Sequence, residues 1–152
     1  MIDIVCLQAH HLPQILEIEQ QSQPDPWSQA LFMSSLSPRY NNLVALEAGE
    51  VLGFLVSDWV CNEACLMNIC VAPQHRKMGV AQALHQSLIA RLLLKHTDKI
   101  WLEVRASNTQ AQALYKKIGY QNIAQRKNYY AATASAPQED AIIMELNLSK
   151  MQ

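Results

Sequence analysis

The sequence lacks the features of several large classes of protein. No apolar run approaches the roughly 20 residues that a membrane-spanning helix needs, and residues 1–11 carry Asp3 but no basic segment of the kind that begins a signal peptide. The net charge is only −1, which argues against a protein that draws its affinity from nucleic-acid phosphates. We therefore expect a cytoplasmic protein that binds neither membranes nor, directly, nucleic acid.

Metal ligands and cross-links are missing as well. The four cysteines form no C-x-x-C pair, and no two histidines have the spacing of a zinc site. The cysteines are Cys6, Cys61, Cys65 and Cys70. This pattern predicts free thiols in a reducing compartment and no metal cofactor. With 50% hydrophobic and 16% charged residues, and neither a repeat nor a linker, we expect one domain over residues 1–152, and a monomer is the favoured state.

Hydrophobic spacing in the first half of the chain predicts a strand, two helices and then three strands. The corresponding segments are residues 2–7, 12–23, 27–37, 43–46, 51–59 and 64–71. Only short turns separate the last three segments, which indicates an antiparallel meander. The run at 64–71 is almost continuously apolar, as in a strand that is buried on both faces.

The second half predicts a long helix, a strand, a short helix and two final strands. These segments are residues 80–96, 100–105, 108–118, 120–130 and 141–148. Ser107 and Gln110 have the spacing of a capping box that starts the short helix, and Gly119 suits its C-terminal end. The predicted order is β-α-α-β-β-β-α-β-α-β-β, which is that of a mixed α/β domain.

The loop before the long helix has the features of an anion site. Arg76 and Lys77 supply mobile positive charge, and Gly79 lets the backbone approach a ligand closely. A helix that begins at Val80 presents unpaired N–H groups and the positive end of its dipole. The loop matches neither the P-loop nor the three-glycine dinucleotide fingerprint. Taken alone, it fits an ordinary strand-to-helix connection with a solvated basic tip even better than a binding site.

Residues 76–81 fit the pattern [QR]-x-x-G-x-[GA], and so resemble the pyrophosphate-binding signature of the GNAT superfamily of N-acetyltransferases. The predicted element order also matches that fold, a mostly antiparallel central sheet flanked by helices. Further segments resemble the ribosomal-protein-alanine N-acetyltransferase (RimI) family: W-L-E-V-R-A-S-N at 101–108, and residues 113–115, 119–120, 126–130 and 139–144. The resemblance covers nearly the whole chain but is weak over 38–65, where acceptor contacts are expected. Ala81 and Cys70 depart from the residues common in the family, although the signature allows alanine at position 81.

The resemblance implies direct transfer of the acetyl group of acetyl-coenzyme A to the N-terminal α-amine of an alanine. The implied partner is the N-terminal segment of a small-subunit ribosomal protein. The implied cofactor-binding residues are Ile69, Cys70, Val71, Arg76, Lys77, Met78, Gly79, Val80, Ala81, Gln82 and Asn108. Two alternatives remain open: the acceptor is a lysine side chain or a small-molecule amine, or the chain is a coenzyme A-binding module without catalysis.

Two side chains are the implied catalytic groups. Glu103 interrupts an apolar strand, and the resemblance makes it the base that removes the proton of the amine; a wet polar face or a pair with an arginine explains it equally well. Tyr115 is the implied acid for the coenzyme A thiolate, and otherwise a core aromatic. Asn108 is either a pantetheine ligand or a helix cap. Cys70 is disfavoured as a nucleophile, because no histidine lies near it in sequence and direct transfer needs no acyl-enzyme.

The remaining polar and aromatic candidates have a structural explanation beside each functional one. The histidines form no ligand constellation, and surface positions explain most of them. Trp27 is expected in the core or as a lid residue, and Tyr129 and Tyr130 as walls of an acceptor tunnel or as strand packing. Glu139 and Asp140 are expected either to face a basic acceptor or to lie in a solvated turn.

Overall fold

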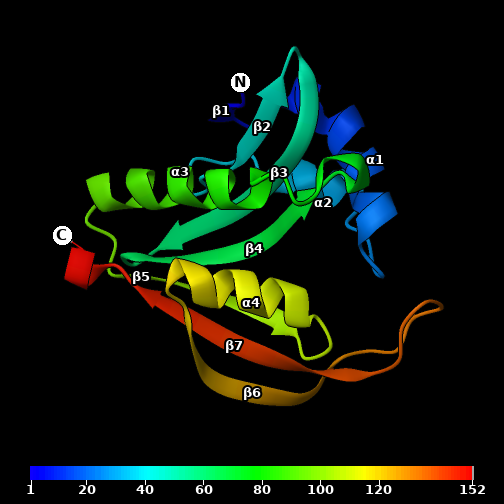
Figure 1. Ribbon diagram of the computed structural model, residues 1–152, viewed down its shortest axis with the longest axis vertical. Coiled ribbons are helices and arrows are strands. Elements are labelled where there is room, and N and C mark those ends of the chain that lie inside the picture. The colour runs from blue at the N-terminus through cyan, green and yellow to red at the C-terminus, as the bar shows by residue number, and fades with distance from the viewer. Residues whose placement is uncertain (152) are drawn as a thin grey trace.

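The computed structural model describes residues 1–151 and is built around one seven-stranded sheet (Figure 1). The strand order is β1-β2-β3-β4-β5-β7-β6, and every neighbouring pair is antiparallel except β4 with β5. The strands are β1 (Asp3–Cys6), β2 (Leu43–Glu47), β3 (Glu50–Val60), β4 (Glu63–Val71), β5 (Lys99–Arg105), β6 (Gln121–Tyr130) and β7 (Glu139–Asn147). The predicted mixed, mostly antiparallel sheet is therefore confirmed, as is the predicted order of helices and strands.

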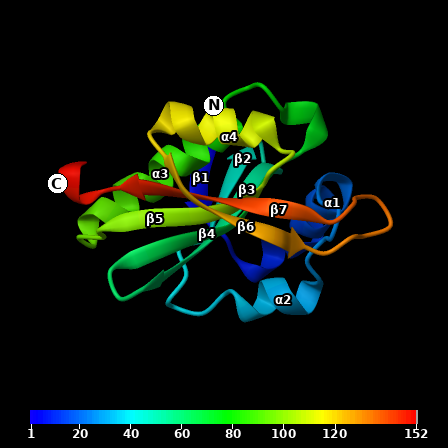
Figure 2. The ribbon, with the colours of Figure 1, turned by 90° about the horizontal axis from the view of Figure 1, so that it is seen from below.

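Helices cover both faces of the sheet, as the view from below shows (Figure 2). The helices are α1 (Leu12–Ser22), α2 (Gln29–Ser34), α3 (Val80–Leu94) and α4 (Thr109–Ile118), with short 3-10 turns at Ala9–His11, Pro73–His75 and Ser149–Met151. One hydrophobic core lies under α3 and α4, and a second lies under α1 and α2. Alternate residues of β2 serve the two cores, since Leu43 and Ala45 face the first and Val44 the second.

The long helix follows its hydrophobic pattern closely. Val80, Leu84, Leu88 and Leu92 form one row of α3, and each is at most 2% exposed. The helix ends at Leu94 rather than near residue 96, because His96 adopts the left-handed conformation with φ 56°. The amide of the next residue then turns back to bond the carbonyl of Leu92 at 3.1 Å.

Three local predictions need correction. α2 spans Gln29–Ser34 instead of residues 27–37, because Ser28 caps its start and the hydroxyls of Ser34 and Ser35 bond the carbonyl of Leu31 at its end. α4 is capped by Asn108, whose Oδ1 accepts the amide of Ala111 at 3.1 Å, so the expected capping box at Ser107 and Gln110 is absent from this helix start.

The third correction concerns β4, which alternates between buried and more exposed residues and is not buried on both faces. The cause is a fork in the sheet. β4 pairs with β5 only from Glu63 to Leu66, although both strands continue further. Against β3, the register passes from Asn68 directly to Leu66, so Met67 is an extra residue that forms a β-bulge. The bulge coincides with the end of pairing to β5, and beyond it the two strands diverge (Figure 1).

Candidate active site

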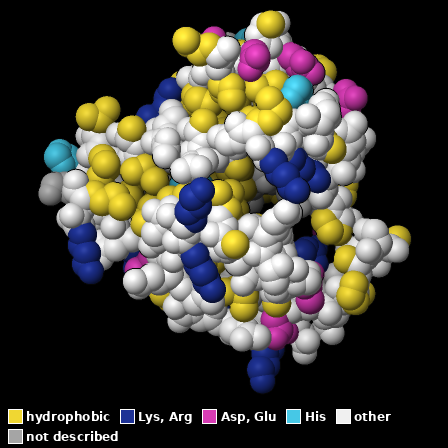
Figure 3. All heavy atoms as spheres, in the orientation of Figure 1, with side chains coloured by type: hydrophobic (Ala, Val, Ile, Leu, Met, Phe, Trp, Pro, Cys, Tyr) yellow, Lys and Arg dark blue, Asp and Glu magenta, His cyan; other side chains and the backbone are white. Residues whose placement is uncertain are grey.

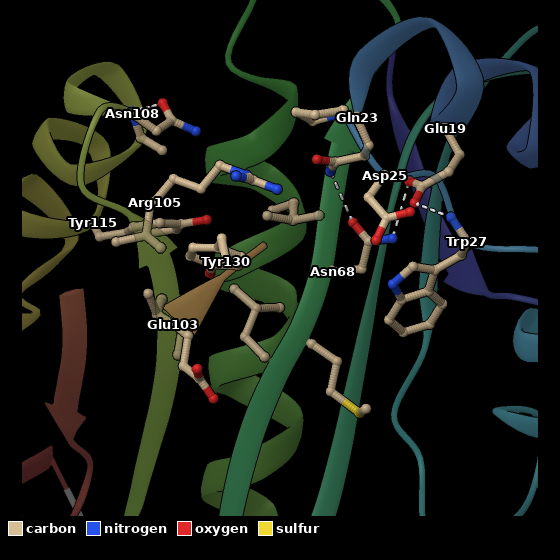
Figure 4. A pocket seen from close by; sticks show the side chains of 17 residues that line it. Glu19, Gln23, Asp25, Trp27, Asn68, Glu103, Arg105, Asn108, Tyr115 and Tyr130 are labelled. Carbon is tan, nitrogen blue, oxygen red and sulfur yellow. Dashed lines mark hydrogen bonds between the residues drawn. The ribbon is translucent and has the colours of Figure 1, made fainter. Parts of the chain in front are cut away.

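The fork between β4 and β5 forms a cleft of about 290 Å³ (Figure 4). Its walls come from the end of α1 and the loop after it, the far half of β4, the far half of β5, and α4. This volume lies at the lower end of the range for small-molecule sites, which suits the reacting ends of two substrates better than a whole large cofactor. Glu103 and Tyr115, the two predicted catalytic residues, both line this cleft.

Glu103 lies on β5 with Trp101 and Arg105 on the same face of the strand, as predicted. Its Oε2 atom is buried and has no hydrogen-bond partner among residues 1–151. The Nη1 atom of Arg126 is 3.8 Å away, and this arginine is 57% exposed and stacks on the ring of Tyr129. The arginine pair considered from the sequence therefore exists, but a loose, solvent-exposed ion pair contributes little. Within the described chain, the carboxylate therefore has one buried oxygen without a hydrogen-bond partner, and the same carboxylate raises the pKa of the nearby Tyr129.

Tyr115 is a core aromatic, as considered from the sequence, and it also lines the cleft. Its ring packs in the core, 6.0 Å from the ring of His85 and 5.6 Å from that of Tyr120, while its hydroxyl points into the cleft (Figure 4). Burial raises the pKa of this phenol well above its usual value, and the nearby Cys70 and Tyr130 add to the shift. The phenol is therefore protonated at neutral pH, and the same shift makes it a weaker acid than an exposed tyrosine.

Cys70 turns its side chain away from the fork, toward α1. Its Sγ atom lies 2.9 Å from Nε2 of Gln23 and 3.4 Å from Oε1 of Glu19. Burial, followed by the charge of Glu19, raises the pKa of this thiol well above its usual range, so it stays protonated. This geometry argues against a nucleophilic cysteine, as expected. Cys70 can serve the cleft only through its backbone, together with the partly buried Ile69 and Val71 on the same diverging edge of β4.

The predicted phosphate loop lies between β4 and α3. Lys77 and Gly79 both adopt left-handed conformations, with φ of 64° and 79°, and no side chain caps the start of α3. The first amides of the helix, those of Val80, Ala81 and Gln82, therefore point out of its N-terminus. The side chain of Val80 belongs to the core at 2% exposure, so this residue can offer a ligand only its amide.

The basic residues of this loop differ in freedom. Arg76 was expected to be mobile, but its guanidinium bonds the carbonyl of Val71 at 3.3 Å and the hydroxyl of Ser22 at 3.1 Å. Arg76 thus joins the ends of β4 and α1. Met78, two residues later in the loop, is 57% exposed. Lys and Arg side chains gather beside a hollow on this face of the molecule (Figure 3). Such a surface favours a negatively charged ligand.

Asn108 is a helix cap, as considered from the sequence, and its role as a pantetheine ligand stays a prediction. Its Oδ1 atom caps α4, and the residue lines the cleft, with the amide nitrogen directed toward it (Figure 4). Trp27 lines the cleft and packs 5.2 Å from the ring of Phe32. Tyr130 lines it too, beneath the guanidinium of Arg105 at 4.3 Å, whereas Tyr129 lies outside this lining.

The sequence analysis missed Glu19, which is fully buried on α1 at one wall of the cleft. Its carboxylate accepts hydrogen bonds from the Trp27 amide and from the side chain of Asn68. A signal for it existed, because Glu19 lies four residues after the buried Ile15 and therefore on the apolar face of its helix. A carboxylate at such a position is buried only when its oxygens have partners.

Some expectations for other residues were wrong. His85 is fully buried rather than at the surface; its Nε2 atom lies 2.6 Å from the Tyr120 hydroxyl, and burial lowers its pKa to about 4. His11 is also buried. Glu139 lies at the start of β7 rather than in a turn, and its carboxylate accepts hydrogen bonds from Arg105 and from the Ser107 amide, each at 3.1 Å.

Asp140 likewise accepts hydrogen bonds, from the Asn128 amide and from the side chain of Gln125.

Over residues 1–151, no three His, Cys, Asp or Glu side chains come together as metal ligands would. In the same part of the chain, none of the helices has the length and apolar character needed to cross a membrane.

Comparison with known proteins agrees with this site. The model of the acetyltransferase (GNAT) family matches residues 10–120. The [ribosomal protein bS18]-alanine N-acetyltransferase of Escherichia coli K12 is 39% identical over 149 residues, which are 98% of this chain and 99% of the relative. The enzyme of the same name from Haemophilus influenzae is 37% identical over 138 residues, 91% of this chain and 93% of the relative.

A solved structure leads to the same family. The crystal structure of the ribosomal-protein-S18-alanine N-acetyltransferase from Escherichia coli superposes with a TM-score of 0.91 at 39% identity, over 98% of this chain and 95% of that one. The fold, the site and the sequence relationship thus point in one direction. The chain belongs to the acetyltransferase (GNAT) family, and within it to the family of these alanine N-acetyltransferases.

Proposed function

We propose that this protein transfers the acetyl group of acetyl-coenzyme A to the N-terminal α-amine of the alanine of ribosomal protein S18, in the cytoplasm. The acceptor rests on the 39% identity, over 98% of this chain, to a bS18-alanine N-acetyltransferase. The chemistry rests on one geometric observation: the side chains of Glu103 and Tyr115 both line the cleft at the fork, and Oε2 of Glu103 has no hydrogen-bond partner among the described residues. The protein acts as a monomeric single domain over residues 1–152 and binds neither membrane nor, directly, nucleic acid.

Two parts of the backbone would hold the cofactor. The uncapped start of α3, with the amides of residues 80–82 and the positively charged Lys77, suits a diphosphate. Arg76, Met78, Gly79 and Gln82 complete that loop, and Asn108 adds an amide from the start of α4. When bound, acetyl-coenzyme A supplies the acetyl group as a reactive thioester. The diverging edge of β4 from Ile69 to Val71 offers backbone N–H groups, one of which would polarise the thioester oxygen.

Glu103 removes the proton from the attacking amine, directly or through one water molecule. A weak base suffices, because an α-amine has a pKa near 8 and keeping it neutral at pH 7 costs only about 1.4 kcal/mol. A lysine side chain, with a pKa of about 10.4, would require several kcal/mol. Tyr115 gives a proton to the departing sulfur atom through the hydroxyl that points into the cleft. The raised pKa makes the phenol a weak acid, so this transfer needs other donors to stabilise the phenolate that forms.

A peptide panel with acetyl-coenzyme A, analysed by mass spectrometry, tests this proposal. It contains a peptide with a free N-terminal alanine, the same peptide with a blocked N-terminus and an added lysine, and spermidine. We expect acetylation of the first peptide at its α-amine. Preference for lysine or spermidine would refute the ribosomal acceptor, and a chain that binds acetyl-coenzyme A without acetylating any of the three would refute the enzyme.

A further inference from the structure

Glu19 is the centre of a hydrogen-bond network that no step of the proposed chemistry uses. It is fully buried, yet it lines the cleft from the end of α1 (Figure 4). Its Oε2 atom accepts the amide of Trp27 at 3.0 Å. Its Oε1 atom accepts the side-chain amide of Asn68 at 3.0 Å and lies 3.4 Å from the Sγ of Cys70. We call these residues, with Gln23, the Glu19 network.

The network joins two parts of the molecule that the backbone does not join at this point. Trp27 and Gln23 belong to the loop after α1, which forms one wall of the cleft. Asn68 and Cys70 belong to β4, just past the bulge where β4 leaves β5. Gln23 adds two bonds across the same gap, 3.2 Å to Oδ1 of Asn68 and 2.9 Å to the Sγ of Cys70.

A buried carboxylate is costly unless charge-assisted hydrogen bonds replace its water. Packing of α1 on the sheet does not require one, because Ile15 and Ile18 already fill that interface. Glu19 is also unsuited to be a second base, since donors occupy both oxygens, in contrast to Oε2 of Glu103. What the carboxylate provides is a defined distance between the Trp27 loop and the cofactor-facing edge of β4.

We propose that Glu19 is a positioning residue that holds the loop of Gln23 and Trp27 against β4 and so sets how the N-terminal segment of the acceptor is bound. This inference rests on the proposed function, because it assigns the loop to the acceptor and the β4 edge to the cofactor. The loop faces the β5 wall that carries Glu103, so displacement of the loop changes the space open to an amine. The cofactor loop at the start of α3 makes a separate link between α1 and β4, in which Arg76 bonds Ser22 and the carbonyl of Val71.

Glu19→Gln tests the proposal with little change of shape. An amide has only one acceptor oxygen, so its NH₂ group faces either the Trp27 amide or the Nδ2 atom of Asn68, both of which are donors. Asn68 can relieve the second arrangement by turning its amide, but it then loses the bond that its Oδ1 accepts from Gln23. We expect KM for the alanine peptide to rise at least fivefold, while KM for acetyl-coenzyme A stays within twofold and the pH profile of kcat is unchanged. Glu17→Gln is the matched control, because it makes the same change at an exposed site on the same helix.

A double variant tests the bonding itself. In Glu19→Gln with Asn68→Asp, the new amide can accept from Trp27 and donate to the new carboxylate, which still accepts from Gln23. We expect KM for the peptide to return to within twofold of the wild type. Unchanged peptide KM in Glu19→Gln would overturn the proposal. A rise in both KM values, together with a lower thermal stability, would also overturn the proposal if the double variant restored none of the three. That result would indicate a general folding role.

The failure of this inference and that of the proposed function give different results. If wild-type protein acetylates spermidine or lysine instead of the alanine peptide, the ribosomal acceptor is wrong. The same KM comparison is then made with the accepted amine. A selective, rescuable rise in the KM of that amine still supports the positioning role, and its absence overturns it.

Discussion

The two walls of the cleft are built in different ways. The β5 wall belongs to regular structure: β5 pairs with β7 along its whole length from Lys99 to Arg105, and α4 packs beside it. The opposite wall, formed by the Trp27 loop, is held by side-chain hydrogen bonds centred on Glu19. In the proposed function, the β5 wall carries the groups that move protons and the Trp27 loop faces the acceptor. Chemistry and acceptor choice can therefore change independently in this fold.

Glu103→Gln should break the chemistry of the β5 wall and has the largest expected effect. Loss of a general base typically lowers the rate by about 10²- to 10⁴-fold. We expect kcat for the alanine peptide to fall within that range while the dissociation constant of acetyl-coenzyme A, measured by calorimetry, stays within about threefold, because Glu103 lies away from the phosphate loop. A rate near that of the wild type would remove Glu103 from its role.

Tyr115→Phe should have the next largest effect on the same wall. The variant keeps the ring that packs on His85 and Tyr120 and loses only the hydroxyl that enters the cleft. We expect turnover to fall at least tenfold, toward the lower end of the range for general acids, with a melting temperature close to that of the wild type. If turnover falls only in proportion to thermal stability, the hydroxyl is structural.

Low pH should reduce the free energy of unfolding through His85, whose ring lies 6.0 Å from that of Tyr115 beside the β5 wall. Its pKa is about 4 in the fold and 6.5 when unfolded. A base whose pKa is lowered by folding loses its stabilising contribution as the pH falls below the unfolded value. This one group should therefore reduce the free energy of unfolding by about 2 kcal/mol between pH 7 and pH 5.

The variant His85→Gln keeps a side chain that can donate to or accept from the Tyr120 hydroxyl and should remove that part of the acid sensitivity. Urea unfolding at pH 7 and pH 5 measures it. The exposed His10→Gln is the matched control, and equal acid sensitivity of the wild type and His85→Gln would contradict the assignment.

Cys70→Ser has the smallest expected effect. It tests whether a side chain on the Glu19 side of the cleft can be changed without loss of turnover, in contrast to Glu103 and Tyr115 on the β5 wall. Because the thiol is protonated and points toward Glu19, it takes no part in acetyl transfer. We expect kcat to stay within about threefold of the wild type, since a hydroxyl can replace the thiol as a hydrogen-bonding group. Intact-protein mass spectrometry during turnover should detect no acetylated enzyme, and acetyl found on Cys70 would reverse this conclusion.

Much of the fold was predictable because it depends on local signals. The row from Val80 to Leu92 repeats at helical spacing, and short turns force the strands from residue 43 to 71 into antiparallel pairs. The errors lay where side chains compete for the same role. Ser107 and Asn108 are both good helix caps, and only the position of Glu139, which binds the Ser107 amide, decides between them.

The candidate site was predictable in part for a similar reason. Glu103 and Tyr115 belong to dense motifs near the end of the chain, so resemblance located them. Glu19 and Asn68 lie 49 positions apart in sequence, and nothing local indicates that they bond. Arg76 was expected to be free, but its partners are on α1 and at the end of β4. Contacts of this range depend on how the helix docks on the sheet.

The amino-acid sequence by itself determined the order of helices and strands, the family and the residue types of the chemistry, since hydrophobic spacing and motifs are local properties. Only the tertiary structure decided where β4 leaves β5, which oxygen of Glu103 remains unbonded, and that Glu19 ties the Trp27 loop to the strand edge. The physical reason is that burial and hydrogen-bond satisfaction are set by the neighbours that distant segments bring together.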